Sequence, residues 1–156
     1  MRAGVIAAAL AQGCVAPVTE VMVVIGSDLV VGVEVDAVRV VLRREGSAAP
    51  THDVVYDLRS GRFAFPGTLG VVARDPDDRA PLEVTVTAAR AGRDRLVARA
   101  TGTPLADAVA RLDLFLARRC LDAAPTDCAP GTVCGRAGCE TVSKDPLPLF
   151  TGVAAP

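Results

Sequence analysis

Alternating apolar and polar residues run along most of this chain. In the stretch "DAVRVVLRREG", the apolar residues Val38, Val40 and Leu42 fall on one face of an extended chain. Arg39 and Arg43 fall on the opposite face. A period of two residues is that of a β-strand with one buried face. The stretch therefore predicts a strand that covers a core on one side only.

Several further stretches show the same alternation or a short apolar run, and turn residues separate them. The longest, "LEVTVTAARAGRDRLVARATG", predicts a hairpin with its turn near 91–94. An apolar run at 19–28 and a short strand at 69–74 extend the pattern. The residues expected to face the core in the remaining strands are Val54, Tyr56, Leu58, Leu82, Val84, Val86, Leu96, Ala98, Ala100, Leu112, Leu114 and Leu116.

These elements predict an all-β fold. About seven short strands at regular spacing, with no long stretch of helical period, are typical of an antiparallel sandwich. The chain has 156 residues, 51% of them hydrophobic and only 3% aromatic, so the core must be aliphatic. Trp and the paired core cysteines of antibody domains are missing. We therefore expect an immunoglobulin-like or transthyretin-like antiparallel sandwich of about seven strands, over residues 14–119.

The N-terminus has the features of an export signal. Arg2 precedes an apolar run, and small residues then lead to Cys14. This run is too short to span a bilayer as a helix but suits a cleaved signal, so residues 1–13 are expected to be removed. Cys14 is then expected to be the site of lipidation. Cleavage after Ala11, which would leave Cys14 a thiol, and no processing at all are the alternatives.

A Cys-rich segment lies at residues 120–139, and its four cysteines form an even set once Cys14 is set aside. Disulfides are expected because the segment is poor in apolar residues and follows an export signal. Zinc is the rival, but the segment lacks the close Cys-x2-Cys pairs typical of structural zinc sites. Of three possible connectivities, our working hypothesis is Cys120–Cys134 with Cys128–Cys139. Residues 140–156 are Pro-rich and are expected to form a flexible tail.

The whole pattern resembles small, uncharacterised lipoproteins of GC-rich Gram-negative bacteria. The resemblance rests on the lipobox-like "LAQGC", the Val-rich strands, the strand end "LFLARRC" and the Cys- and Gly-rich segment after it. It implies attachment to the cell envelope, in the outer membrane, through an acylated Cys14. The family has no assigned reaction, so the resemblance implies no catalytic residue.

Charge and residue types narrow the function further. The net charge of −1 gives no basic field for nucleic acid, which is not expected as a partner. His52 is the only histidine, and no nucleophile motif surrounds the serines. The loop "RDPDDRAP" holds three aspartates, Asp75, Asp77 and Asp78, but lacks the glycine and distal glutamate of an EF-hand. We expect no enzyme activity, no cofactor and no metal site.

Two functions remain. The first is a non-catalytic cell-envelope lipoprotein that acts as a structural or adhesive module, with the membrane as anchor and an envelope protein or surface polymer as partner. The alternative is a secreted or periplasmic binding protein for a small molecule, metal or peptide. Aromatic residues, which usually line such pockets, are scarce here, so the first function is favoured.

Overall fold

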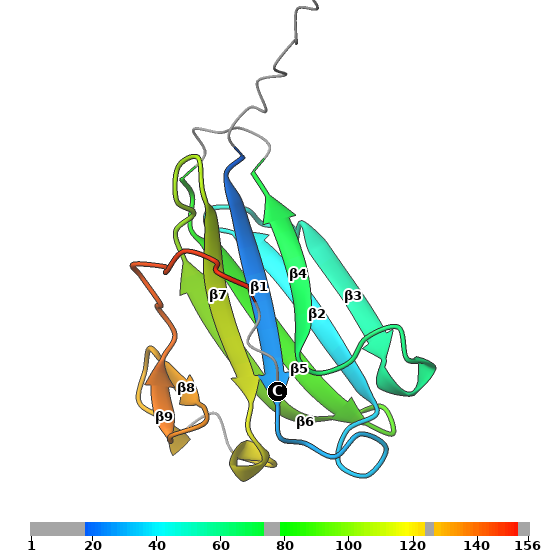
Figure 1. Ribbon diagram of the computed structural model, residues 1–156. Helices are drawn as coiled ribbons and strands as arrows, with labels where there is room; N and C mark the ends of the chain where they lie inside the picture. The colour runs from blue at the N-terminus through cyan, green and yellow to red at the C-terminus, as the bar shows by residue number, and fades with distance from the viewer. Residues whose placement is uncertain (1–17, 74–78, 124–126, 153–156) are drawn as a thin grey trace, which may run out of the picture.

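Two β-sheets face each other in the computed structural model, which describes residues 18–73, 79–123 and 127–152 (Figure 1). One sheet has the order β4-β1-β7 and the other β3-β2-β5-β6. Their bounds are β1 Glu20–Ser27, β2 Ala37–Arg44, β3 His52–Asp57, β4 Gly67–Val72, β5 Leu82–Arg90, β6 Arg93–Gly102 and β7 Val109–Leu116. The all-β sandwich predicted from the alternation is confirmed.

The strand order differs from that of an immunoglobulin domain. In immunoglobulin domains the first two strands share a sheet, whereas here β1 and β2 lie in different sheets. Neighbouring strands of the sandwich run antiparallel, with one exception: β1 pairs in parallel with β7. A parallel pair needs a long connection, and the chain between β1 and β7 supplies it by forming the rest of the sandwich.

The core lies between the sheets and is built from the predicted faces. Alternate residues are buried along most of β5 and β6 and along all of β7, including Leu82, Ala98 and Leu112. The predicted hairpin of β5 and β6 turns at Ala91 and Gly92, both with positive φ, as in the two-residue turns that suit twisted strands. β3 differs from the prediction, because Val54 is exposed at the edge of its sheet.

A small third sheet follows the sandwich. Its strands β8 (Thr132–Cys134) and β9 (Cys139–Thr141) pair in an antiparallel hairpin, here called the Cys-rich hairpin. Disulfides join Cys120 to Cys134 and Cys128 to Cys139, which is the connectivity of our working hypothesis. Cys120 ends the short 3-10 helix η2 (Arg118–Cys120) after β7 and is buried. The first disulfide therefore ties the hairpin to the sandwich.

The expectation of a flexible tail at 140–156 is wrong for its described part, to residue 152. Residues 142–150, here called the C-terminal strap, lie along the outer edges of β6 and β7. The N–H of Thr101 donates to the carbonyl of Val142 at 2.9 Å, and the N–H of Arg111 donates to the carbonyl of Pro148 at 2.8 Å. Leu147 is buried in the core. Two sheet edges that lack partners explain why this Pro-rich stretch is ordered.

Candidate functional site

The predicted lipidation site lies outside the described residues, as do residues 1–13. The described chain starts at Val18, just before β1. In Figure 1 this start lies at the upper end of the sandwich, and the Cys-rich hairpin lies near the lower end. No helix among the described residues is long and apolar enough to cross a membrane.

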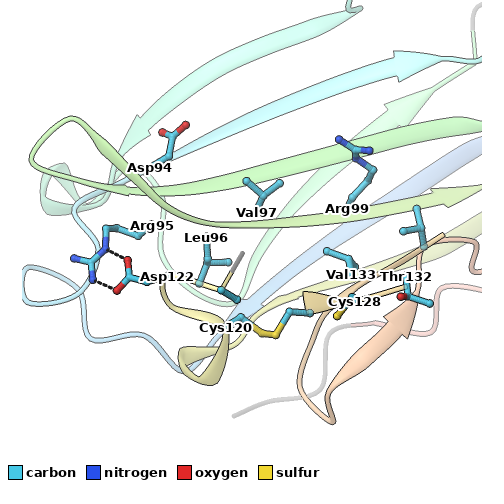
Figure 2. A pocket seen from close by; sticks show the side chains of 13 residues that line it. Asp94, Arg95, Leu96, Val97, Arg99, Cys120, Asp122, Cys128, Thr132 and Val133 are labelled. Atoms are coloured by element: carbon cyan, nitrogen blue, oxygen red, sulfur yellow. Dashed lines mark hydrogen bonds and ion pairs between the residues drawn. A yellow bond between two sulfur atoms is a disulfide. The ribbon is translucent and has the colours of Figure 1, made fainter. Parts of the chain in front are cut away.

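A cavity of about 620 Å³ separates β6 from the Cys-rich hairpin (Figure 2). Its volume is within the range of ligand pockets, roughly 300–1,000 Å³. One wall is β6, with Val97 and Arg99, and another is the hairpin, with Thr132 and Val133. Cys120 also lines the cavity. The disulfides hold the two walls in place, because the hairpin is too short to have a core of its own.

An ion pair closes one end of this cavity. The guanidinium of Arg95 donates two hydrogen bonds of 2.9 Å to the carboxylate of Asp122, and the two side chains meet face to face in Figure 2. The backbone N–H of Asp122 also donates to the carbonyl of Arg95, at 3.0 Å. The hydrogen bond from Arg95 lowers the pKa of Asp122, and the same bond raises the pKa of Arg95. Asp122 is thereby fixed against the start of β6.

Acid is expected to loosen this contact. Because the pKa of Asp122 is lowered in the folded protein, its charge stabilises the contact fully above the ordinary carboxyl pKa of about 3.9. The contribution is lost as the pH falls through the lowered pKa. Hydrogen-exchange protection of the Asp122 amide should therefore be unchanged from neutral pH down to about pH 5 and should drop as the pH falls below about 3.9.

The variant Asp122→Asn provides the control for this measurement, since it keeps the shape of the side chain and removes its charge. It should be less protected at neutral pH and should lose less protection on acidification. An equal loss in the variant and in the wild type would contradict the assignment to Asp122.

A second hollow, of about 550 Å³, lies at the far edge of the same sheet and is lined by β3 and the residues after it. Beside it the structure brings together several of the few aromatic residues of the chain. The rings of Tyr56 and Phe63 are 5.1 Å apart, and those of Phe63 and Phe65 are 5.8 Å apart. The sequence signal for this cluster was the closely spaced pair in "RFAFPG".

His52 belongs to this aromatic group and does not face a nucleophile. Its Nε2 lies 3.2 Å from the hydroxyl of Tyr56. This is the one hydrogen bond of its imidazole within the described part of the chain. The three aspartates of "RDPDDRAP" fall at 75–78, outside the described residues, and no group of side chains suited to a metal ion occurs among those described.

The loop between β1 and β2 presents an apolar surface at the lower end of the sandwich in Figure 1. Val30, Val31 and Val33 are exposed there. The loop is held in shape by Glu34, whose carboxylate accepts a hydrogen bond from the N–H of Val30 at 2.7 Å. Arg118 of η2 pairs with the same carboxylate at 2.9 Å. Exposed apolar side chains on a fixed loop are typical of a contact surface.

Together these features define a small all-β sandwich whose disulfide-bonded C-terminal hairpin forms a cavity with an edge strand. Comparison of the chain with models of protein families, with curated proteins and with solved structures finds no match. The fold and the cavity are therefore the basis for assigning a function.

Proposed function

We propose that this protein is an exported, non-catalytic interaction module, tethered to the cell envelope through an acylated Cys14. The outer membrane is the proposed location, and an envelope protein or a surface polymer is the proposed partner. Two disulfides in one short segment support export, because such bonds persist in oxidising compartments.

The observation that carries this proposal is that the start of β1 and the exposed surfaces described above lie at opposite ends of the sandwich. Only five residues lie between Cys14 and Glu20, the first residue of β1, so the two residues are about 20 Å apart at most. A tether at Cys14 would thus keep the end of the sandwich where β1 begins close to the membrane. The Cys-rich hairpin and the loop between β1 and β2 lie toward the opposite end (Figure 1). Both surfaces would point away from the anchoring membrane, toward a partner.

Replacing Cys14 is the direct test. Wild-type protein should be labelled by palmitate, should sediment with membranes and should need detergent for extraction. Cys14→Ser should lose the label and move to the soluble fraction, because only the acyl chains hold the protein there. Several chains are needed, since one gives only marginal binding.

The matched control is Ala16→Ser, which introduces the same hydroxyl two residues away and should behave as wild type. Labelled Cys14→Ser protein, or a fully soluble wild type, would overturn the tether. The mass of the mature N-terminus separates the remaining cases, since cleavage after Ala11 leaves Cys14 as a thiol.

The cavity beside β6 supports one alternative, a secreted or periplasmic binding protein. Its volume of about 620 Å³ is large enough for a small ligand or a few residues of a peptide. Cleavage after Ala11 together with a soluble periplasmic wild type would favour this alternative.

A further inference from the structure

β6 is an outer strand of its sheet, and its free edge is only partly covered. Alternate residues of an antiparallel strand direct their backbone groups to opposite sides. Thr101 faces away from β5, because its N–H donates to Val142 and its carbonyl accepts from the N–H of Lys144, both at 2.9 Å. By the same alternation, the backbone groups of Val97 and Arg99 also face outward.

The section between the two covered ends has no partner. At one end the carbonyl of Arg95 accepts from Asp122, and at the other end Thr101 is paired with the C-terminal strap. Within the described residues, the N–H and carbonyl groups of Val97 and Arg99 have no hydrogen-bond partner on this side. They border the cavity of about 620 Å³. Such a row of unpaired donors and acceptors is a template for one more strand.

The surroundings of this section decide what can pair with it. From Arg95 to Thr101 the edge measures about 20 Å, at about 3.4 Å per residue. The Cys-rich hairpin stands beside the section as the second wall of the cavity (Figure 2). The volume of about 620 Å³ is enough for a few residues of an extended chain, whereas the hairpin stands on the side from which the sheet edge of a second folded copy would approach.

The edge of β3 also borders a hollow, but among the described residues that hollow is lined only by β3 and the residues directly after it. No second element therefore stands opposite this edge to form a second wall. The edge of β7 is covered by the C-terminal strap, where the N–H of Phe150 donates to the carbonyl of Val109. The section at Val97 and Arg99 is thus more suitable for strand addition than the edges of β3 and β7.

We propose that this section binds an extended peptide segment of a partner protein, which adds to the sheet as a strand beside β6. Side chains of paired residues lie on the same face of a sheet and interact there. Val97 is 42% exposed, so the residue opposite it is aliphatic. Arg99 is half exposed, and its Nε lies 3.6 Å from a carboxylate oxygen of Glu83. Because half of the Arg99 side chain remains exposed, an acidic residue on the added strand can pair with it. The partner segment is therefore acidic and aliphatic.

This inference rests on the proposed function, since it specifies the partner of the envelope module. A suitable probe is the peptide acetyl-Glu-Thr-Val-Thr-Glu-amide, whose side chains read the same in both directions. It therefore places Val beside Val97 and Glu beside Arg99 in either strand orientation. Titration into the full exported protein, followed by NMR, should show saturable binding. Hydrogen exchange of the Val97 and Arg99 amides should slow at least about tenfold at saturation.

Two control peptides distinguish strand addition from nonspecific binding of the peptide. A version N-methylated at its three central residues lacks the backbone donors that would pair with the middle of the section, and it should bind at least about tenfold more weakly, equivalent to about 1.4 kcal/mol. The version with Lys in place of both Glu should also bind more weakly, because it meets Arg99 with a like charge. Equal binding of the N-methylated peptide would overturn the proposal.

Two protein variants provide the matched test. Val97→Pro removes an N–H that has no partner, which an edge strand tolerates, and should weaken the peptide at least about tenfold. Val97→Ala keeps the N–H and should change affinity by less than about threefold. If Val97→Pro fails to fold by circular dichroism, the comparison of the two peptides on wild-type protein decides.

Absence of slowed exchange at Val97 and Arg99 at millimolar peptide overturns this inference. If Cys14-dependent membrane attachment persists in that case, the proposed function stands without it. If the wild-type protein binds the peptide but carries no acyl chain, the tether alone is overturned.

Discussion

Leu112→Ala is expected to lower the free energy of unfolding by about 2–5 kcal/mol. Leu112 is fully buried in the centre of β7 and pairs with Val23 of β1. Truncation removes apolar contacts and leaves a cavity in a core that is close-packed. The core holds few aromatic side chains, and its small aliphatic residues give little scope for filling the space. The midpoint and slope of urea denaturation would measure the loss.

Asp113→Ala is the matched control, one residue further along the same strand. Asp113 is exposed and pairs with Arg111 at 2.8 Å, and an exposed ion pair contributes about 0–1 kcal/mol. The change should therefore cost less than about 1 kcal/mol. If the two variants were equally destabilised, the assignment of inward and outward faces in β7 would be wrong.

The faces of the strands were predictable because the alternation is a local signal. A strand with one buried face must be apolar at every second position, so the sequence of β5 shows directly that Val84 and Val86 are buried. The position of the hairpin turn was predictable from another local signal, Gly92, which adopts the positive φ that such turns need.

Pairing between distant strands could not be predicted in this way. Nothing in the alternation of β1 says that it pairs with β4 and β7, because register and partner depend on the whole sheet. β3 shows the same limit. Its alternation predicted Val54 as buried, yet Val54 is exposed because β3 is an edge strand.

The candidate site was predictable only in its cysteines. Their spacing and number indicated disulfides, and the structure forms them within the segment. The cavity itself depends on contacts between residues far apart in the chain, such as Arg95 and Asp122, and on the place where the hairpin stands off from β6. These are consequences of the fold, and no motif signals them.

The prolines near the C-terminus are the reason why a flexible tail was predicted there. Pro146 and Pro148 flank Leu147 and prevent regular pairing of this stretch, which suggested a loose tail. The same stretch still places one leucine in the core and pairs single residues with β6 and β7. The order of the strap comes from the sheet edges that it covers, so it could not be predicted from the local sequence.

Leu147→Ala is expected to destabilise the protein by about 2–4 kcal/mol, because this one side chain anchors the C-terminal strap in the core. Leu147 is 4% exposed. It packs so closely on Gly102 that a Cβ there would lie 2.6 Å from its Cδ2 atom. Removing the side chain should lower the urea midpoint and speed hydrogen exchange at the Thr101 amide, which bonds to Val142.

Leu149→Ala makes the same chemical change two residues further on and is the control. Leu149 is 60% exposed, so its truncation should change the free energy of unfolding by less than about 0.5 kcal/mol. The two leucines differ in burial and share the segment, so a flexible strap predicts small and equal effects for both. A strap docked through Leu147 predicts a large effect for Leu147 alone, with faster exchange reaching Thr101 on β6 and the Arg111 amide, which bonds to Pro148, on β7.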